Sequence, residues 1–214
     1  MRRSRPAILP PLAGRFLLYN VHRMTSSEYD IEDFPDLVAA ARLDRRVQNI
    51  HWFSGLGDPL SDEDRKIARA YLDELGFPYA EPALITHLED AAACYESNDI
   101  NSEGWEAEEQ MRIALIDEAM HLVDETNLTI ALQSVPASAA TYARAAAEEA
   151  ALHFGIDDEA LVNAMVGSAS RATYMATLAL LAEKDETHPA AHRFHLFERG
   201  RWPLDIVGST FNIF

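Results

Sequence analysis

Glu118 and His121 form the pattern in this sequence that most resembles a metal-binding motif. Their spacing places a carboxylate and an imidazole one helical turn apart, which is the arrangement that helical bundles use to hold two metal ions. Such a site needs a second pair, and the nearest candidate is Glu149 with His153, whose spacing is one residue longer. Iron, manganese or zinc is therefore one alternative for these four residues, and we expect no cofactor otherwise.

The hydrophobic pattern around Glu118 and His121 favours a different role. At 100° per residue, both fall in the polar arc of their helix beside Asp117 and opposite Ile116. Because ligands of a metal pair should point into the bundle, we favour a solvated helix face over a metal site. His153 falls nearer an apolar side of its own helix, so we expect a hydrogen-bonded histidine of the core.

Three histidines near the C-terminus, His188, His192 and His195, follow one another at helical spacing and share a stripe with Arg199. They could hold an anion or a metal ion. The first and last lie two turns apart on a straight helix, so at most two of the imidazoles could reach one ion. We favour a weakly cationic, solvent-facing surface that complements the negative end of the helix dipole.

Arg171 is the only charged residue between Ala160 and Ala182, in a stretch that is apolar on all sides. A guanidinium in such a central helix needs a carboxylate or carbonyl partner to offset its desolvation. The candidate partners are Glu118, Glu148 and Glu149. Arg171 is therefore either one half of a buried ion pair, which we favour, or the cation of a site for an anionic ligand.

The formal net charge of −17 comes from 35 acidic and 18 basic residues. This balance disfavours nucleic acid and anionic membrane surfaces, both of which require clustered Lys and Arg, and it favours a basic protein as a partner. Cys94 is the only cysteine, so an intramolecular disulfide is excluded and a cytoplasmic location is expected. The sequence also lacks a phosphate-binding Gly-rich loop, a Gly-x-Ser-x-Gly elbow and a His-Glu-x-x-His motif.

The N-terminal segment differs from the rest of the chain. Arg2, Arg3, Arg5, Arg15 and Arg23 precede the first acidic residue, Glu28, which leaves 13 basic against 35 acidic residues beyond Arg23 and a charge of −22. Prolines interrupt the segment and Arg15 divides its apolar stretch, so a secretory signal is not expected. We predict that 1–23 is a loose arm or a misassigned extension, and that 24–214 is a single helical domain.

Hydrophobic periodicity and capping residues predict the elements that position these side chains. The expected helices cover 33–54, 61–75, 82–96, 102–123, 138–154 and 157–183, and a short helix at 189–199 precedes a hairpin of 204–206 with 210–213. The alternating stretch 127–136 is either a strand or an extension of the preceding helix. The fold class is therefore all-α: a single-domain bundle of about six main helices, with a short C-terminal helix and a small β-hairpin.

Charge and the missing motifs together favour a non-enzymatic function. The main hypothesis is a protein-binding module, for example a regulator or an immunity-type inhibitor of a basic partner. The alternative is a helical-bundle metalloprotein or metalloenzyme with carboxylate and histidine ligands.

Overall fold

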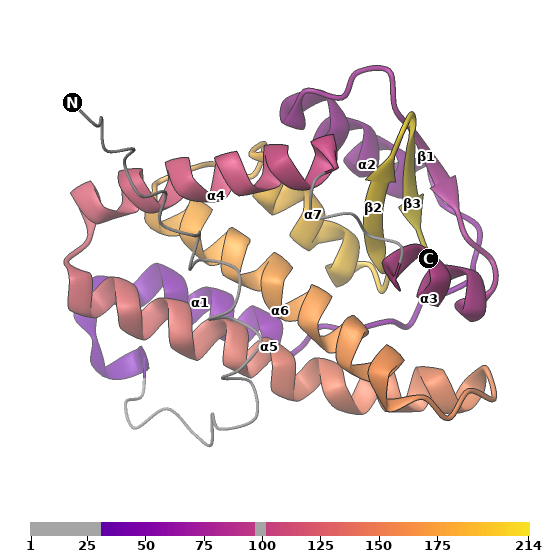
Figure 1. Ribbon diagram of the computed structural model, residues 1–214. Coiled ribbons are helices and arrows are strands. Elements are labelled where there is room, and N and C mark those ends of the chain that lie inside the picture. Colours follow the sequence, from indigo (N-terminus) through magenta and orange to yellow (C-terminus); the bar gives the residue numbers. More distant parts are fainter. Residues whose placement is uncertain (1–30, 97–101) are drawn as a thin grey trace, which may run out of the picture.

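The computed structural model describes residues 31–96 and 102–214, which form a helical bundle with a small sheet (Figure 1). Two 3-10 turns, η2 (Ile31–Asp33) and η3 (Pro35–Leu37), come first. The other elements follow in the order α1 (Val38–Val47), α2 (Asp62–Leu75), β1 (Glu81–Leu84), α3 (Leu88–Glu96), α4 (Glu103–Leu122), α5 (Glu125–His153), α6 (Glu159–Leu181), α7 (Pro189–Glu198), β2 (Pro203–Val207) and β3 (Thr210–Ile213). The predicted all-α bundle with a C-terminal hairpin is confirmed, whereas the predicted arm 1–23 lies outside the described residues.

Helix α6 lies at the centre of the bundle, in contact with α1, α4, α5 and α7 (Figure 1). Its sequence explains this position, because 14 of its side chains are buried and Arg171 is its only charged residue beyond the first turn. Helix α5 packs along it through small side chains at every fourth position, all buried: Ala139, Ala143, Ala147 and Ala151. Small residues let two helix backbones approach closely.

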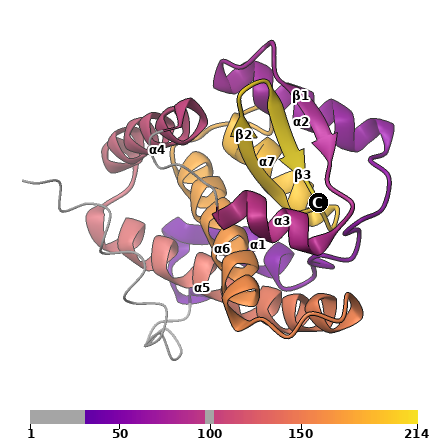
Figure 2. The same cartoon turned by 45° about the vertical axis from the view of Figure 1, so that its right-hand side comes forward.

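A three-stranded sheet lies at one end of the molecule, beside α2, α3 and α7 (Figure 2). The predicted hairpin is present as β2 and β3, and β3 also pairs in parallel with β1 in the order β1-β3-β2. The prediction of a helix from Pro82 is therefore wrong for its first residues, and α3 begins only at Leu88. Pro82 is tolerated because β1 is an edge strand, where a missing backbone donor costs little.

Both alternatives predicted for 127–136, a strand or an extension of the preceding helix, are wrong. Helix α4 ends at Leu122, and the stretch belongs to α5, which is continuous from Glu125 to His153. Asp124 begins this helix, since its carboxylate accepts hydrogen bonds from the backbone N–H groups of Thr126 and Asn127, both at 3.0 Å. The predicted start after Pro136 is thus too late, because Pro136 is buried inside the helix. Its carbonyl accepts a hydrogen bond from the Ser170 hydroxyl of α6, at 3.1 Å.

Helix α1 is shorter than predicted at both ends. It begins at Val38 rather than at residue 33, and it ends at Val47 rather than at Ser54. The reason is that Trp52 and Phe53 turn into the core, and Phe53 adopts a positive φ of 60° that no α-helix accommodates.

The predicted helix 61–75 is confirmed as α2. Ser61 and Asp64 form a capping box, and Gly76 closes the helix in the left-handed conformation. At α6 the capping residue is Asp158, whose carboxylate accepts hydrogen bonds from the backbone N–H groups of Ala160 and Leu161. No helix within the described ranges is both long enough and apolar enough to cross a membrane.

Candidate functional site

Arg171 pairs with Glu108 of α4, with 3.4 Å between a guanidinium nitrogen and a carboxylate oxygen. The predicted partners Glu118, Glu148 and Glu149 are wrong, because all three lie exposed on their helices. The Arg171 side chain is itself 37% exposed, so it reaches from the central helix toward the surface.

Glu108 is the centre of a polar network inside the bundle. Its buried carboxylate accepts a hydrogen bond from the Tyr71 hydroxyl of α2 and contacts Arg193 of α7 closely. Arg193 also donates to the carbonyl oxygens of Pro203 and Leu204, at 3.3 and 2.8 Å. The network thus joins α2, α4, α6, α7 and β2 through one carboxylate.

A second carboxylate lies beside these arginines. Burial raises the pKa of Asp205 above its ordinary value, and the charges of Arg193 and Arg171 oppose this rise. Burial also raises the pKa of Tyr71, which keeps its hydroxyl protonated as a donor to Glu108. Both guanidiniums pair with Glu108, and their positive charges also act on Asp205, so the cluster links several elements of the bundle.

The spacing of residues in α4 indicates that Glu108 faces the core, although Glu108 was not among the predicted partners of Arg171. Glu108 precedes Leu115 by seven residues and Ala119 by eleven, so all three fall on the same side of α4. Leu115 and Ala119 are both buried. A carboxylate on the core-facing side of a helix is a strong candidate to pair with an arginine of the central helix.

A separate ion cluster holds the loop after α1. Asp64 is 1% exposed and contacts Arg199 and Arg201, the latter at 2.9 Å. Arg201 also donates to the carbonyl oxygens of Gly55, Asp58 and Pro59. Burial alone would raise the pKa of Asp64, but hydrogen bonds from Arg199 and from Ser61 outweigh it and lower the pKa. These contacts hold the loop after α1 in place, and both oxygens of the Asp64 carboxylate already have partners.

The three C-terminal histidines have separate surroundings. His188 is the N-cap of α7, and its Nδ1 accepts a hydrogen bond from the backbone N–H of Ala190 at 3.2 Å. The rings of His192 and His195 lie 6.4 Å apart, centroid to centroid, and His195 Nε2 is 2.7 Å from Glu186. Burial lowers the pKa of His188 and of His192. The structure therefore does not direct the three imidazoles at one ion.

The four predicted metal ligands lie at the surface. Glu118 pairs with Lys184, and His121 Nδ1 is 2.6 Å from the carbonyl oxygen of Asp117, so the interpretation of a solvated face is confirmed there. His153 is exposed and stacks edge-on against Phe154, so its predicted place in the core is wrong. Within the described residues, no three His, Cys, Asp or Glu side chains are grouped to hold a metal ion.

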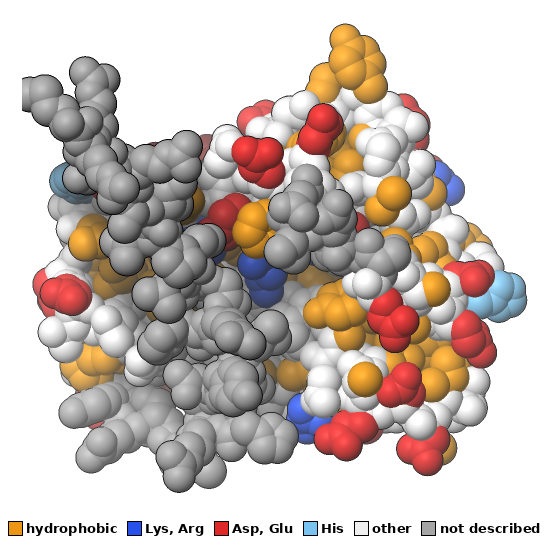
Figure 3. Space-filling model, viewed as in Figure 1, with side chains coloured by type: hydrophobic (Ala, Val, Ile, Leu, Met, Phe, Trp, Pro, Cys, Tyr) orange, Lys and Arg blue, Asp and Glu red, His pale blue; other side chains and the backbone are white. Residues whose placement is uncertain are grey.

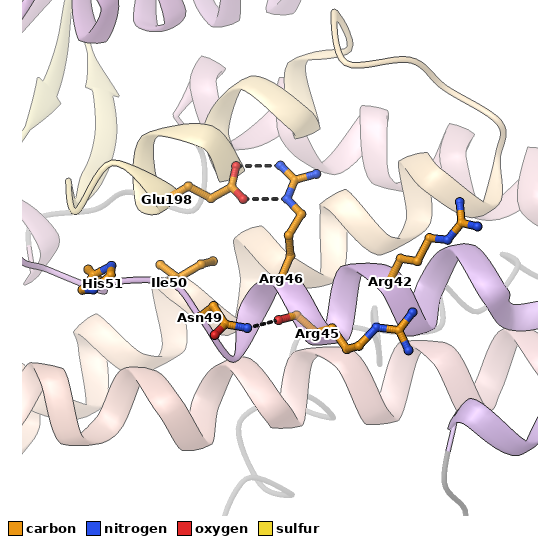
Figure 4. Close-up of a pocket in the computed structure, with 7 residues that line it drawn as sticks. All are labelled: Arg42, Arg45, Arg46, Asn49, Ile50, His51 and Glu198. Carbon is orange, nitrogen blue, oxygen red and sulfur yellow. Dashed lines mark hydrogen bonds and ion pairs between the residues drawn. The ribbon is translucent and has the colours of Figure 1, made fainter.

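A pocket of about 440 Å³ lies between the C-terminal half of α1 and the end of α7 (Figure 4). Arginines from successive positions of one face of α1 line it, together with polar and apolar neighbours: Arg42, Arg45, Arg46, Asn49, Ile50, His51 and Glu198. Arg46 points to Glu198 and donates to both carboxylate oxygens, at 2.8 and 2.7 Å. The sequence did not predict this pocket, because it depends on where α7 ends relative to α1.

The outward side of α4 combines apolar and acidic side chains. Ile113 and Met120 are 56% and 60% exposed, and they lie on the same side of the helix as Glu106 and Asp117. At 100° per residue these four positions fall within an arc of about 60°. We call them the α4 outer face. A wide apolar stripe on a helix is normally covered by other helices, but only the core-facing part of this one is covered.

Most basic side chains of the described chain are paired with acidic ones. Of the 13 Lys and Arg residues from Ile31 to Phe214, 11 form an ion pair with an acidic side chain: Arg45, Arg46, Lys66, Arg69, Arg112, Arg144, Arg171, Lys184, Arg193, Arg199 and Arg201. In Figure 3, acidic side chains accordingly outnumber basic ones on the visible face. Most of the cations are thus already neutralised by the chain itself.

Comparison of the chain with protein families, with curated proteins and with solved structures finds no match. The side chains described above are therefore the basis for assigning a function.

Proposed function

We propose that this protein is a non-enzymatic binding module that engages a basic protein partner through the α4 outer face. The observation that carries the proposal is the exposure of Ile113 and Met120 beside the acidic residues Glu106 and Asp117. Large apolar side chains exposed on one helix face are typical of surfaces that a partner covers. Acidic neighbours favour a partner that carries Lys or Arg around its own apolar contacts.

The charge balance of the whole chain supports a basic partner. The body beyond Arg23 carries −22, and most of its cations are already held in ion pairs. The acidic side chains that have no such pair attract a cationic partner at long range and raise the rate of association at low ionic strength. A regulator or an inhibitor of a basic protein would use a surface of this kind.

The shape of the surface favours a protein over a small molecule. The α4 outer face is the outward side of a single helix, whereas small-molecule sites are concave and enclose most of their ligand. An apolar helix face with flanking charges instead suits a partner helix, which contacts it at positions three, four and seven residues apart. We therefore expect the partner to present an amphipathic segment with basic flanks.

Selection of peptides from a random display library tests the proposal and does not require the partner to be identified first. The parent protein is the only bait, so the selection itself does not decide which surface the retained peptides bind. We expect the retained peptides to be enriched in Lys and Arg and to carry apolar residues at helical spacing.

A matched control separates this face from general attraction to an acidic protein. Leu152 is 79% exposed on α5, and Glu149 lies nearby on the same helix. Leu152→Ser/Glu149→Gln therefore removes similar side chains elsewhere, and it should bind the retained peptides like the parent. Ile113→Ser/Met120→Ser should weaken binding at least tenfold, because hot-spot side chains each contribute more than about 1.4 kcal/mol. Equal affinity for both variants, or a retained pool that is not basic, would refute the proposal.

A further inference from the structure

The chain itself contains a segment with the chemistry expected of a partner for the α4 outer face. Residues 1–27 hold five arginines and no acidic residue, although the chain as a whole is strongly acidic. Within them, the apolar run 16–19, Phe-Leu-Leu-Tyr, lies between Arg15 and Arg23. An apolar stretch with basic residues on both sides complements a surface that combines apolar and acidic side chains. We call residues 1–23 the N-terminal arm; they precede the part of the chain that the structure describes.

Helix α4 carries the charge that such a segment requires. Its 20 residues include six acidic side chains and one arginine, the largest excess of negative charge in any helix of the described chain. Three of the six are already paired with basic side chains: Glu108, Glu109 and Glu118. The other three are exposed and form no ion pair among the described residues: Glu103, Glu106 and Asp117. At 100° per residue these three fall within an arc of about 100° that also holds Ile113 and Met120.

The arm is attached where it can reach this helix. The described chain begins at Ile31, which is buried in η2, and η2 contacts α1 and α5. Figure 1 shows the start of the described chain and the connection from α4 to α5 on the same side of the molecule. Twelve residues separate Tyr19 from Ile31 and can span up to about 40 Å, whereas α4 is about 30 Å long. The apolar run of the arm is therefore within reach of the α4 outer face of its own chain.

We propose that the N-terminal arm binds to the α4 outer face of its own chain and competes there with the basic protein partner. The apolar run 16–19 contacts Ile113 and Met120, and the flanking arginines pair with the unpaired carboxylates of α4. This regulation rests on the proposed function, since it acts on the same surface. A short tether gives an effective concentration of about 1 mM, so an intrinsic Kd of about 0.1 mM is enough to weaken the binding of an external peptide about tenfold.

A nitroxide spin label on the arm of the full chain tests this contact without any partner. The label is attached in the variant Cys94→Ala/Ala13→Cys, and thermal melting verifies that this variant keeps the fold. We expect the strongest line broadening of amide signals between Glu106 and Met120, and none around Leu152 of α5. Broadening that is absent from α4 would overturn the proposal. Broadening in a mixture of spin-labelled chains with isotope-labelled chains would also overturn it, because it would show the arm of a second copy on this face.

The affinity for a selected basic peptide tests the competition and leaves Cys94 unchanged. In the full chain, Arg15→Gln/Leu17→Ser/Arg23→Gln should bind the peptide about tenfold more tightly than the parent, because the competing segment is weakened. Adding Ile113→Ser/Met120→Ser to this variant should abolish the gain, since the peptide and the arm use the same side chains.

The matched control is Arg42→Gln/Arg65→Gln/Leu152→Ser. It removes the same charge and one exposed leucine outside the arm, and neither arginine forms an ion pair among the described residues, so the affinity should stay that of the parent. An equal gain in this control would overturn the proposal, and so would equal affinity of the parent and the arm variant. If that equal affinity still depends on Ile113 and Met120, the proposed function stands without the competition. Peptide binding that does not depend on Ile113 and Met120 would refute the proposed function, and the competition with it.

Discussion

Removal of the charge of Arg171 should matter less to stability than removal of the charge of Arg193, although both contact the same carboxylate. Arg193 is 14% exposed, contacts Glu108 closely and donates to two backbone carbonyls. Arg171 is 37% exposed and reaches Glu108 only at 3.4 Å. The Glu108 carboxylate therefore stays compensated when Arg171 is lost, and becomes an incompletely compensated buried charge when Arg193 is lost.

These geometries set the expected magnitudes. A partly exposed pair contributes at most about 1 kcal/mol to the free energy of unfolding, so Arg171→Met should cost no more than that. Breaking a buried pair leaves a charge without its partner, and Arg193→Met should cost on the order of 3–5 kcal/mol. Glu108→Leu should cost a similar amount, because it leaves Arg193 unpaired inside the bundle.

Two double-mutant cycles by urea denaturation measure the difference. The first combines Glu108→Leu with Arg193→Met, and we expect a coupling energy of about 2–3 kcal/mol. The second combines Glu108→Leu with Arg171→Met, and we expect less than about 1 kcal/mol. The exposed pair Glu118 and Lys184 provides a reference cycle close to zero. A larger coupling for Arg171 than for Arg193 would show that the assignment of the buried pair is incorrect.

Three further predictions concern single residues. Gly200→Ala should lower the free energy of unfolding by more than about 2 kcal/mol, because Gly200 has a φ of +77° and an added Cβ would lie 2.5 Å from the Ser54 hydroxyl oxygen. Gly155 also has a positive φ but has open space around it, so Gly155→Ala should cost only about 1 kcal/mol in the same urea denaturation assay. Phe211→Ala should cost about 3–5 kcal/mol in the same assay, because its ring is fully buried, and a smaller loss would show that the sheet end repacks. The free energy of unfolding should fall as the pH drops through about 6.5, because burial depresses the folded-state pKa of His188 and the unfolded chain binds the extra proton. His188→Asn should weaken this dependence of the free energy of unfolding on pH. An unchanged dependence in the variant would show that His188 does not cause it.

Local signals in the sequence predicted the elements whose pattern is complete within a few turns. The central place of α6 follows from its uncharged stretch around Arg171, and the bounds of α2 follow from Ser61 and Gly76. Alternation of apolar and polar residues predicts a strand at 210–213, and Phe211 and Ile213 are both fully buried in it. Each of these predictions rests on neighbouring residues alone and is independent of any distant segment.

Predictions failed where a distant segment decides the conformation. Pro82 lies in a strand because β1 pairs with β3, more than a hundred residues later in the chain. The partner of Arg171 depends on how α4 crosses α6, and the periodicity of either helix alone cannot give that crossing. The same limit explains the pocket, since Arg46 and Glu198 come together only in the folded chain.

Mapping the binding site of a selected basic peptide on the folded protein tests the central claim most directly. Amide chemical-shift changes of the labelled protein, recorded during titration with such a peptide, map the contact residue by residue. The proposed function predicts that the largest changes lie between Glu106 and Leu122 of α4, with small changes in α1 and α7. Changes that centre on another element, with α4 unaffected, would contradict the claim that the α4 outer face is the binding surface.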